Sequence, residues 1–246
     1  MIKAFIFDLD GTLVETESLR MRSHARAVVE LTGGSLDEAE VAENCERYVG
    51  VPREDTIGEL VERYGLNKVP RRRLAELGVS KPEQAFRLLD DRYYQAMVSD
   101  KDTVRRAQFI HTVALLRQVR RSGYKTGLAT MSAPQEVRLV LEALDLYEEF
   151  DCIATCSDTP NGKPEPDIFL IVAWRLSVRP EECVVIEDSP PGVQSALAAG
   201  MWCIAVPNEF TRQRFESGDL LDQRWIVYDP RQLMRVVQEM VAEREK

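Results

Sequence analysis

Five short apolar runs in the second half of the chain alternate with helical stretches, and this alternation restricts the fold more than any other feature. The runs are KTGLAT (125–130), FDCIAT (150–155), ECVVIED (182–188), MWCIAV (201–206) and RWIVYD (224–229). Each has the length and composition of a buried strand. Strands that alternate with helices form a parallel sheet covered on both faces. A further apolar run at 2–7 adds a first strand, so the sequence predicts an α/β fold.

Helix-start and helix-stop signals support the helical stretches between these runs. Capping boxes, in which a serine is followed three residues later by a glutamate or glutamine, predict helix starts at Ser35, Ser80 and Ser132. A helical pattern also covers 166–177, and Gly200 is a stop signal for the helix that precedes it.

A long gap separates the first strand from the next one. The first strand ends at Asp8 and the second begins near Tyr124, whereas a crossover needs only about a dozen residues, so the gap is about ten times longer than required. Helical patterns fill it at 17–34, 35–50, 52–65 and 80–97. We therefore predict a core of residues 1–14 and 100–246 with an inserted helical cap, residues 15–99. Ligands bind at the carboxyl edge of parallel sheets, so an insertion there would act as a lid.

Two strands of the predicted sheet end in pairs of acids. Asp8 and Asp10 follow the first strand, and because alternate strand residues point the same way, both carboxylates would face one side. A lone pair of this kind can also merely cap a turn. Glu187 and Asp188 end another strand, however, and four carboxylates at one edge are costly unless a cation lies among them. Oxygen ligands of this kind suit Mg²⁺.

Two further segments could bind an anion. Thr130 ends a strand and Ser132 lies at the start of the next helix, where a hydroxyl and the free amides can hold a phosphate. Lys163 lies in the stiff turn NGKPEP, although a loop lysine is usually solvated. Taken together, these groups make a phosphoryl-transfer site in which Asp8 is the nucleophile, and Asp10 protonates the leaving oxygen and then activates water.

Four motifs in this order resemble the haloacid dehalogenase-like phosphatase superfamily, in the branch of β-phosphoglucomutase and phosphoglycolate phosphatase. They are DLDGT (8–12), Thr130 after an apolar strand, Lys163 in GKPEPD, and EDSPPG (187–192). The resemblance covers nearly the whole chain. It implies a Rossmann-like core with an inserted helical-bundle cap. The dehalogenases of the superfamily lack the second aspartate of the first motif, so Asp10 favours phosphate chemistry.

The resemblance also implies roles for individual residues. It implies Asp8 as nucleophile and Asp10 as acid/base. The residues implied to bind phosphate are Thr130, Met131 and Lys163. Those implied to hold Mg²⁺ are Asp8, Asp10 through its carbonyl, and Asp188, with Glu187 as a ligand or near neighbour.

Substrate choice is expected to lie in the cap, where two arginines are candidates. Arg53, in GVPREDT (50–56), matches the arginine with which β-phosphoglucomutase grips a second phosphate, but it could equally pair with nearby acids. Arg20 occupies the position of a mutase histidine, and could contact an anionic substrate or lie on a solvated helix face. The mutase cap lysine falls near Leu89. The lone histidines His24 and His111 are interpreted as structural.

Composition excludes several other classes of protein. The chain has 246 residues, 44% of them hydrophobic, and its net charge of −9 argues against binding to nucleic acid. Its five cysteines form no C-x-x-C pair and it has two histidines, which argues against a zinc site. No apolar run approaches the ~20 residues of a membrane span, and we see no signal peptide. We expect a cytoplasmic monomer or weak dimer whose partner is a small phosphorylated metabolite.

The sequence thus predicts a Mg²⁺-dependent phosphatase of small phosphorylated metabolites, such as sugar phosphates. One alternative is a hexose phosphomutase that uses the same aspartyl phosphate. A second is a non-enzymatic module that responds to phosphate, against which the large insertion and Asp10 both count.

Overall fold

The computed structural model describes residues 1–49, 51, 53–216 and 219–245. The chain divides into two compact units. One, the core unit, comprises Met1–Glu15 and Lys101–Lys246, and the other, the helical unit, comprises Thr16–Asp100. Each boundary lies one residue later than the sequence predicts. Gly50 and Pro52, which belong to the predicted segment 50–56, lie outside the described residues.

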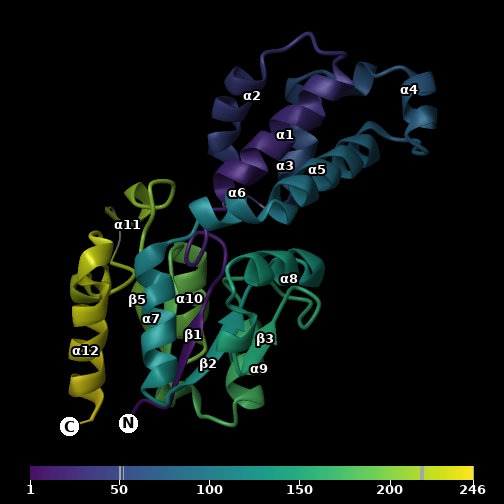
Figure 1. Cartoon of the computed structure of the whole chain (residues 1–246). Coiled ribbons are helices and arrows are strands. Elements are labelled where there is room, and N and C mark those ends of the chain that lie inside the picture. Colours follow the sequence, from purple (N-terminus) through teal and green to yellow (C-terminus); the bar gives the residue numbers. More distant parts are fainter. Residues whose placement is uncertain (50, 52, 217–218, 246) are drawn as a thin grey trace. The chain divides into compact units, whose positions relative to one another are not determined.

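A five-stranded parallel sheet forms the centre of the core unit (Figure 1), in the order β3-β2-β1-β4-β5. The strands are β1 (Ala4–Phe7), β2 (Lys125–Ala129), β3 (Cys152–Ala154), β4 (Cys183–Glu187) and β5 (Trp202–Ala205). The first strand of the sequence lies in the middle of the sheet, between β2 and β4. This arrangement confirms the predicted α/β Rossmann-like class.

The predicted sixth strand at 224–229 is wrong. Within the described residues this segment forms the short 3-10 helix η5 (Gln223–Trp225) and a single bridge, from Ile226 to Ala205. The side chain of Asp222 accepts from the amide of Arg224, and that of Asp229 accepts from the amide of Arg231. Turns therefore take up both ends of the segment, and the part left between them is too short for a strand.

Helices cover both faces of the sheet. α7 (Ile110–Arg121) packs on β1 and β2, and α12 (Leu233–Arg244) packs on α7 (Figure 1). α9 (Asp167–Arg175) lies on β2 and β3, and α10 (Pro190–Ala198) lies on β4 and β5. Ile6 faces the apolar cluster of α9 and α10, while its neighbour Phe5 contacts the ring of Tyr124. α9 approaches closely because a Cβ at Gly127 would lie 2.4 Å from a methyl of Val172.

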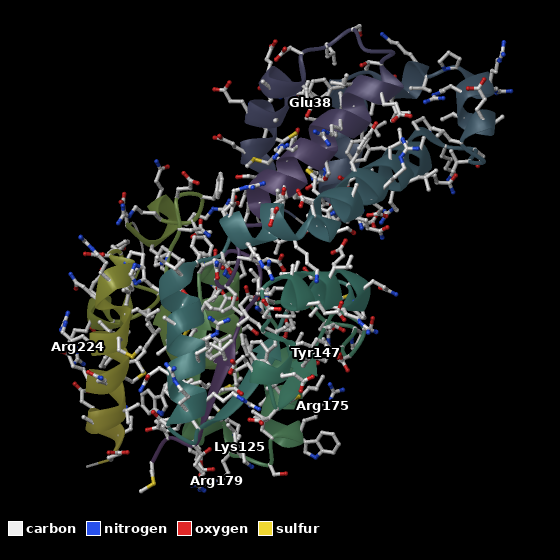
Figure 2. The ribbon with its side chains drawn as sticks, viewed as in Figure 1. Glu38, Lys125, Tyr147, Arg175, Arg179 and Arg224 are labelled. Carbon is white, nitrogen blue, oxygen red and sulfur yellow. The ribbon has the colours of Figure 1, made fainter. Side chains whose placement is uncertain are left out.

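The edge of the sheet where the strands begin carries cations that serve the fold. Lys125 and Arg175 lie at this end of the core unit in Figure 2. The Nζ of Lys125 donates to the carbonyl of Leu176 at the end of α9, at 2.5 Å, and Arg175 pairs with Asp158. Cations at helix C-termini stabilise the exposed carbonyls there. Functional side chains gather at the opposite edge.

The helical unit is built around α1 (Glu17–Leu31), which packs on α5 (Pro82–Ser99) and α2 (Glu38–Asn44). α3 (Arg53–Arg63) also packs on α5. The shorter elements of this unit are η1 (Cys45–Tyr48), η2 (Leu66–Lys68) and α4 (Arg71–Glu76). The remaining elements of the core unit are α6 (Lys101–Arg106), α8 (Pro134–Ala143), α11 (Gln213–Glu216), η3 (Tyr147–Glu149), η4 (Pro180–Glu182) and η6 (Pro230–Gln232). No helix in the described part of the chain has the length and apolarity needed to cross a membrane.

The helices that the sequence predicts are present, but the three predicted capping boxes are wrong. Asp37, rather than Ser35, caps α2 by accepting from the amide of Glu40. Gln84, rather than Glu83, accepts from the amides before α5. Ser132 does not cap α8, whose N-cap residue is Ala133 without a side-chain bond. A serine three residues before an acid or amide is a local pattern, and other nearby donors and acceptors can compete with it.

Candidate active site

The ends of three neighbouring strands bring the predicted acids together. Phe7 pairs in register with Leu128 of β2 and with Ile186 of β4, so the next residue, Asp8, lies between Ala129 and Glu187. The amide of Asp8 donates to the carbonyl of Ile186 at 3.0 Å. The site therefore follows directly from the parallel register at the centre of the sheet.

Lys163 connects two of these acids. Its Nζ donates to Oδ1 of Asp8 at 2.6 Å, to Oε1 of Glu187 at 2.8 Å and to the carbonyl of Ala129 at 3.1 Å. All three charged side chains are buried. Burial alone lowers the pKa of Lys163, but the two carboxylates outweigh it, so the net shift is upward and the ammonium stays charged.

Glu187 is held by the start of α10. Its Oε2 accepts from the amide of Ser189 at 2.7 Å and from the hydroxyl at 2.9 Å. A Cβ at Gly192 would lie 1.8 Å from Oε1 of Glu187, so only glycine leaves room for this carboxylate. Both oxygens of Glu187 thus have partners from the protein.

Asp188 is oriented by two neutral side chains. Thr12 donates to its Oδ1 at 3.3 Å, and Asn208 donates to its Oδ2 at 2.9 Å. Asn208 follows β5 and also donates to the carbonyl of Gly11. These bonds fix the carboxylate without neutralising its charge.

Asp10 turns toward the end of β2. Its Oδ2 accepts from the hydroxyl of Ser132 at 2.5 Å and from that of Thr130 at 3.2 Å. Gly11 makes the exit turn with a φ of 81°. Met131, which follows Thr130, has an exposed side chain. The predicted core residues therefore lie around one strand edge.

The charges of this cluster do not balance. Burial raises the pKa of Asp8 to about 7; Lys163 opposes this shift, and the carboxylate of Glu187 adds to it. Oxygens of Asp8, Glu187 and Asp188 lie within 4.8 Å of one another. Hard oxygen donors with excess negative charge fit Mg²⁺. Glu187 pairs with the charged Lys163, whereas the donors Thr12 and Asn208 leave the charge of Asp188 in place, so Asp188 fits the ion better than Glu187.

The two predicted cap arginines surround a different acid, Asp90 of the helical unit. Arg53 donates to Asp90 at 3.1 Å and also pairs with Asp91, and Arg20 lies 3.7 Å from Asp90. The guanidinium of Arg20 stacks 3.4 Å from the centre of the Tyr94 ring. Arg53 therefore pairs with nearby acids, as one of its two interpretations predicts. A role for Arg53 in substrate binding stays a hypothesis.

Comparison with known proteins identifies the family. The family model for haloacid dehalogenase-like hydrolases matches residues 2–200. The chain belongs to this family. The predicted resemblance and the prediction of an enzyme are thereby confirmed.

Relatives named for phosphatase and mutase activities both resemble the chain. The phosphorylated carbohydrates phosphatase of Thermotoga maritima is 32% identical, over 81% of this chain and 82% of the relative. The β-phosphoglucomutase of Bacillus subtilis is 29% identical, over 83% of each chain. The crystal structure of β-phosphoglucomutase from Clostridium difficile matches with a TM-score of 0.69, 24% identity and coverage of 99% of this chain and 98% of that one. This last likeness shows the fold.

Several residues at the site were not anticipated. Thr12 lies inside the motif DLDGT, so its place there could have indicated it. For Ser132 the sequence predicts a place at a helix start and in the anion site, but not the bond to Asp10. Asn208 has no local signal, because only the order of β4 and β5 brings it to Asp188.

Proposed function

We propose that the chain is a Mg²⁺-dependent phosphatase of small phosphorylated metabolites, sugar phosphates among them, that works through an aspartyl phosphate. The observation that carries this proposal is the buried trio of Asp8, Lys163 and Glu187, with Asp188 beside it. A carboxylate is activated as a nucleophile only if its repulsion of the phosphate is offset. Lys163 offsets part of this repulsion, and a divalent ion held by Asp8 and Asp188 would offset the rest.

Each residue then has a defined task. Asp8 attacks phosphorus while the ester P–O bond breaks, and Asp10 gives a proton to the leaving oxygen. Asp10 next takes a proton from the water that attacks the aspartyl phosphate, which releases inorganic phosphate and restores Asp8. The hydroxyl of Thr130, the amide of Met131 and Lys163 hold the phosphoryl oxygens.

Asp8, Asp188 and the carbonyl of Asp10 are the proposed Mg²⁺ ligands. When bound, the ion supplies positive charge to the phosphoryl oxygens. We assign Glu187 the task of holding Lys163 against Asp8, because its other oxygen is taken by Ser189.

The phosphomutase is the second candidate, supported by the Bacillus subtilis relative. A mutase must protect its aspartyl phosphate from water and gate its acid/base. Arg20, in the position of the mutase histidine, remains protonated near neutral pH and cannot shuttle a proton. Leu89, near the position of the mutase lysine, is buried and apolar. These two residues favour hydrolysis.

Phosphorus NMR separates the two functions. The enzyme with Mg²⁺ is incubated with β-glucose 1-phosphate and a trace of glucose 1,6-bisphosphate, and separately with p-nitrophenyl phosphate. A phosphatase releases inorganic phosphate in both, without needing the bisphosphate. Clean conversion to glucose 6-phosphate without free phosphate would establish the mutase instead, and no turnover of any ester would refute both.

A further inference from the structure

Two hydroxyl groups at the end of β2 hold the carboxylate of Asp10. Ser132 Oγ donates to Oδ2 of Asp10 at 2.5 Å, and Thr130 Oγ1 donates to the same oxygen at 3.2 Å. The amide of Ser132 donates to Thr130 Oγ1 at 3.0 Å, which fixes the two hydroxyls side by side. Thr130 is fully buried, and Ser132 and Asp10 are half-buried.

The hydroxyl of Ser132 does not cap the helix that follows it. A serine at the N-cap position commonly accepts a bond from an amide of the first turn. Ser132 lies one residue before that position, because the N-cap residue of α8 is Ala133, which makes no side-chain cap bond. The hydroxyl of Ser132 is thus committed to Asp10, 122 positions earlier in the chain.

We propose that Ser132 is a positioning residue that, with Thr130, retains Asp10 at the phosphate-binding hydroxyls until a phosphoryl group displaces it. This inference rests on the proposed function, in which Thr130 binds the phosphoryl group and Asp10 serves the leaving oxygen. A hydroxyl has one proton to donate. The hydroxyl of Thr130 therefore cannot serve Asp10 and a phosphoryl oxygen at once.

Arrival of the phosphoryl group and release of Asp10 are in this way the same event. Thr130 turns its proton from the carboxylate to the phosphoryl oxygen, and Asp10 then leaves Ser132 as well. Repulsion between the phosphoryl oxygens and the Asp10 carboxylate acts in the same direction. Asp10 is thereby freed to face the leaving oxygen only when a substrate is bound.

The direction in which the affinity for inorganic phosphate changes on mutation of Ser132 tests this role. In Ser132→Ala, phosphate no longer has to break the bond between Ser132 and Asp10, so its dissociation constant, measured calorimetrically with Mg²⁺ present, should fall by about five-fold. If Ser132 were instead a direct phosphate ligand, the constant would rise. If it were merely structural, the constant would stay unchanged. Either of these two results overturns the proposal.

A double-mutant cycle locates the effect at Asp10. In the Asp10→Ala background there is no carboxylate to release, so adding Ser132→Ala should leave the dissociation constant unchanged. Tightening that persists without Asp10 would contradict the proposal. Ser132→Thr keeps a hydroxyl and should restore the wild-type affinity. Ser122→Ala, at an exposed serine whose hydroxyl accepts from the side-chain amide of Gln118, is the matched control.

Steady-state kinetics supply a second readout. With p-nitrophenyl phosphate, Ser132→Ala should lower KM several-fold, because binding of the ester no longer has to break the bond between Ser132 and Asp10. A parallel fall in affinity and kcat would indicate a direct ligand. Wild-type turnover of the same ester tests the proposed phosphatase separately, so failure of that function would not be mistaken for failure of the role of Ser132.

Discussion

The core unit and the helical unit each bury an aspartate beside cations, and the two acids respond in opposite ways. Asp8 shares one lysine with Glu187, and burial raises its pKa to about 7. Asp90 is also buried, which by itself would raise its pKa. The bond from His24, with further contributions from Arg20 and Ser23, outweighs the burial and brings the pKa to about 2.

The balance of charge explains this difference. Around Asp8 the acids outnumber the cations, and the missing positive charge must come from an ion or a ligand. Asp90 accepts from Ser23 and Arg53 and lies 2.8 Å from Nδ1 of His24, so the protein itself satisfies it. A buried carboxylate with too few hydrogen-bond donors and cations around it indicates a functional site. One whose negative charge is satisfied by the protein indicates a structural role.

The largest expected effect is the loss of turnover in Asp8→Asn. The amide keeps the shape but has no charge with which to attack phosphorus, so kcat should fall by roughly 10³-fold or more. Stability should not fall, because the ionised Asp8 is the form that burial disfavours. Activity on p-nitrophenyl phosphate and the melting temperature measure the two effects. Activity retained at more than a tenth of the wild-type rate would remove Asp8 from its role.

Removal of divalent ions should have the next largest effect. With excess chelator, turnover should fall by about 100-fold or more, and Mg²⁺ should restore it. Mg²⁺ should also raise the melting temperature of the wild type, since a ligand that binds only the folded state stabilises it. Asp188→Asn should lose this thermal shift, whereas Asp91→Asn in the helical unit should retain it. Full activity in chelator would exclude the metal.

The sequence allows the role of Asp8 to be predicted more readily than that of Asp90. Asp8 ends an apolar strand, and parallel strands place their ends at one edge, so its neighbours could be predicted. Asp90 and Asp91 look alike in the sequence. Asp90 lies one helical turn from both Phe86 and Tyr94 on the buried face of α5, a spacing that could have distinguished it.

Contacts that depend on tertiary structure could not be predicted in this way. Ser132 fits a capping box, and only the approach of Asp10 in the folded chain redirects its hydroxyl. The segment 224–229 has the composition of a strand, but strand composition says nothing of whether enough residues can pair. Local pattern therefore predicts the five strands of the sheet, several of the helices and the acids, whereas the donors around the acids depend on the tertiary fold.

Removing the charge of Asp90 should destabilise the helical unit. Asp90→Asn leaves Arg53 and His24 without their shared anion, which should cost about 2 kcal/mol. Hydrogen exchange at the amides of α1 and α5 measures this locally. Asp91→Asn removes a more exposed acid that also pairs with Arg53, and should cost less than about 1 kcal/mol. Equal losses in the two variants would contradict a special role for the buried position.

Arg53→Ala tests whether the Asp90 cluster also serves substrate. As a structural arginine it should change KM for no substrate. As the grip for a second anionic group, it should raise KM for a bisphosphate several-fold while leaving KM for p-nitrophenyl phosphate unaffected. Arg87→Ala, which breaks the exposed pair with Glu54, is the control in the same unit. A selective rise in KM for the bisphosphate would show that the cluster around Asp90 also binds substrate and is not purely structural.

The two acids should also differ in the pH dependence of stability. The pKa of Asp90 falls from 3.8 to about 2 on folding, so its contribution, about 2 kcal/mol, is present above pH 4 and is lost as the pH falls toward 2. The pKa of Asp8 rises, so without metal it costs stability as the pH rises from about 4 to 7.

Urea unfolding in chelator, from pH 2.5 to 8, compares the wild type with Asp90→Asn and Asp8→Asn. The stability deficit of Asp90→Asn should shrink as the pH falls below 4. The advantage of Asp8→Asn should instead grow as the pH rises from 4 to 7. The stability difference between the wild type and each variant should therefore change with pH in opposite directions. The direction depends on whether the folded protein gives the buried carboxylate enough hydrogen-bond donors and positive charge. Curves of the same sign for both variants would mean that the two clusters do not differ in this way.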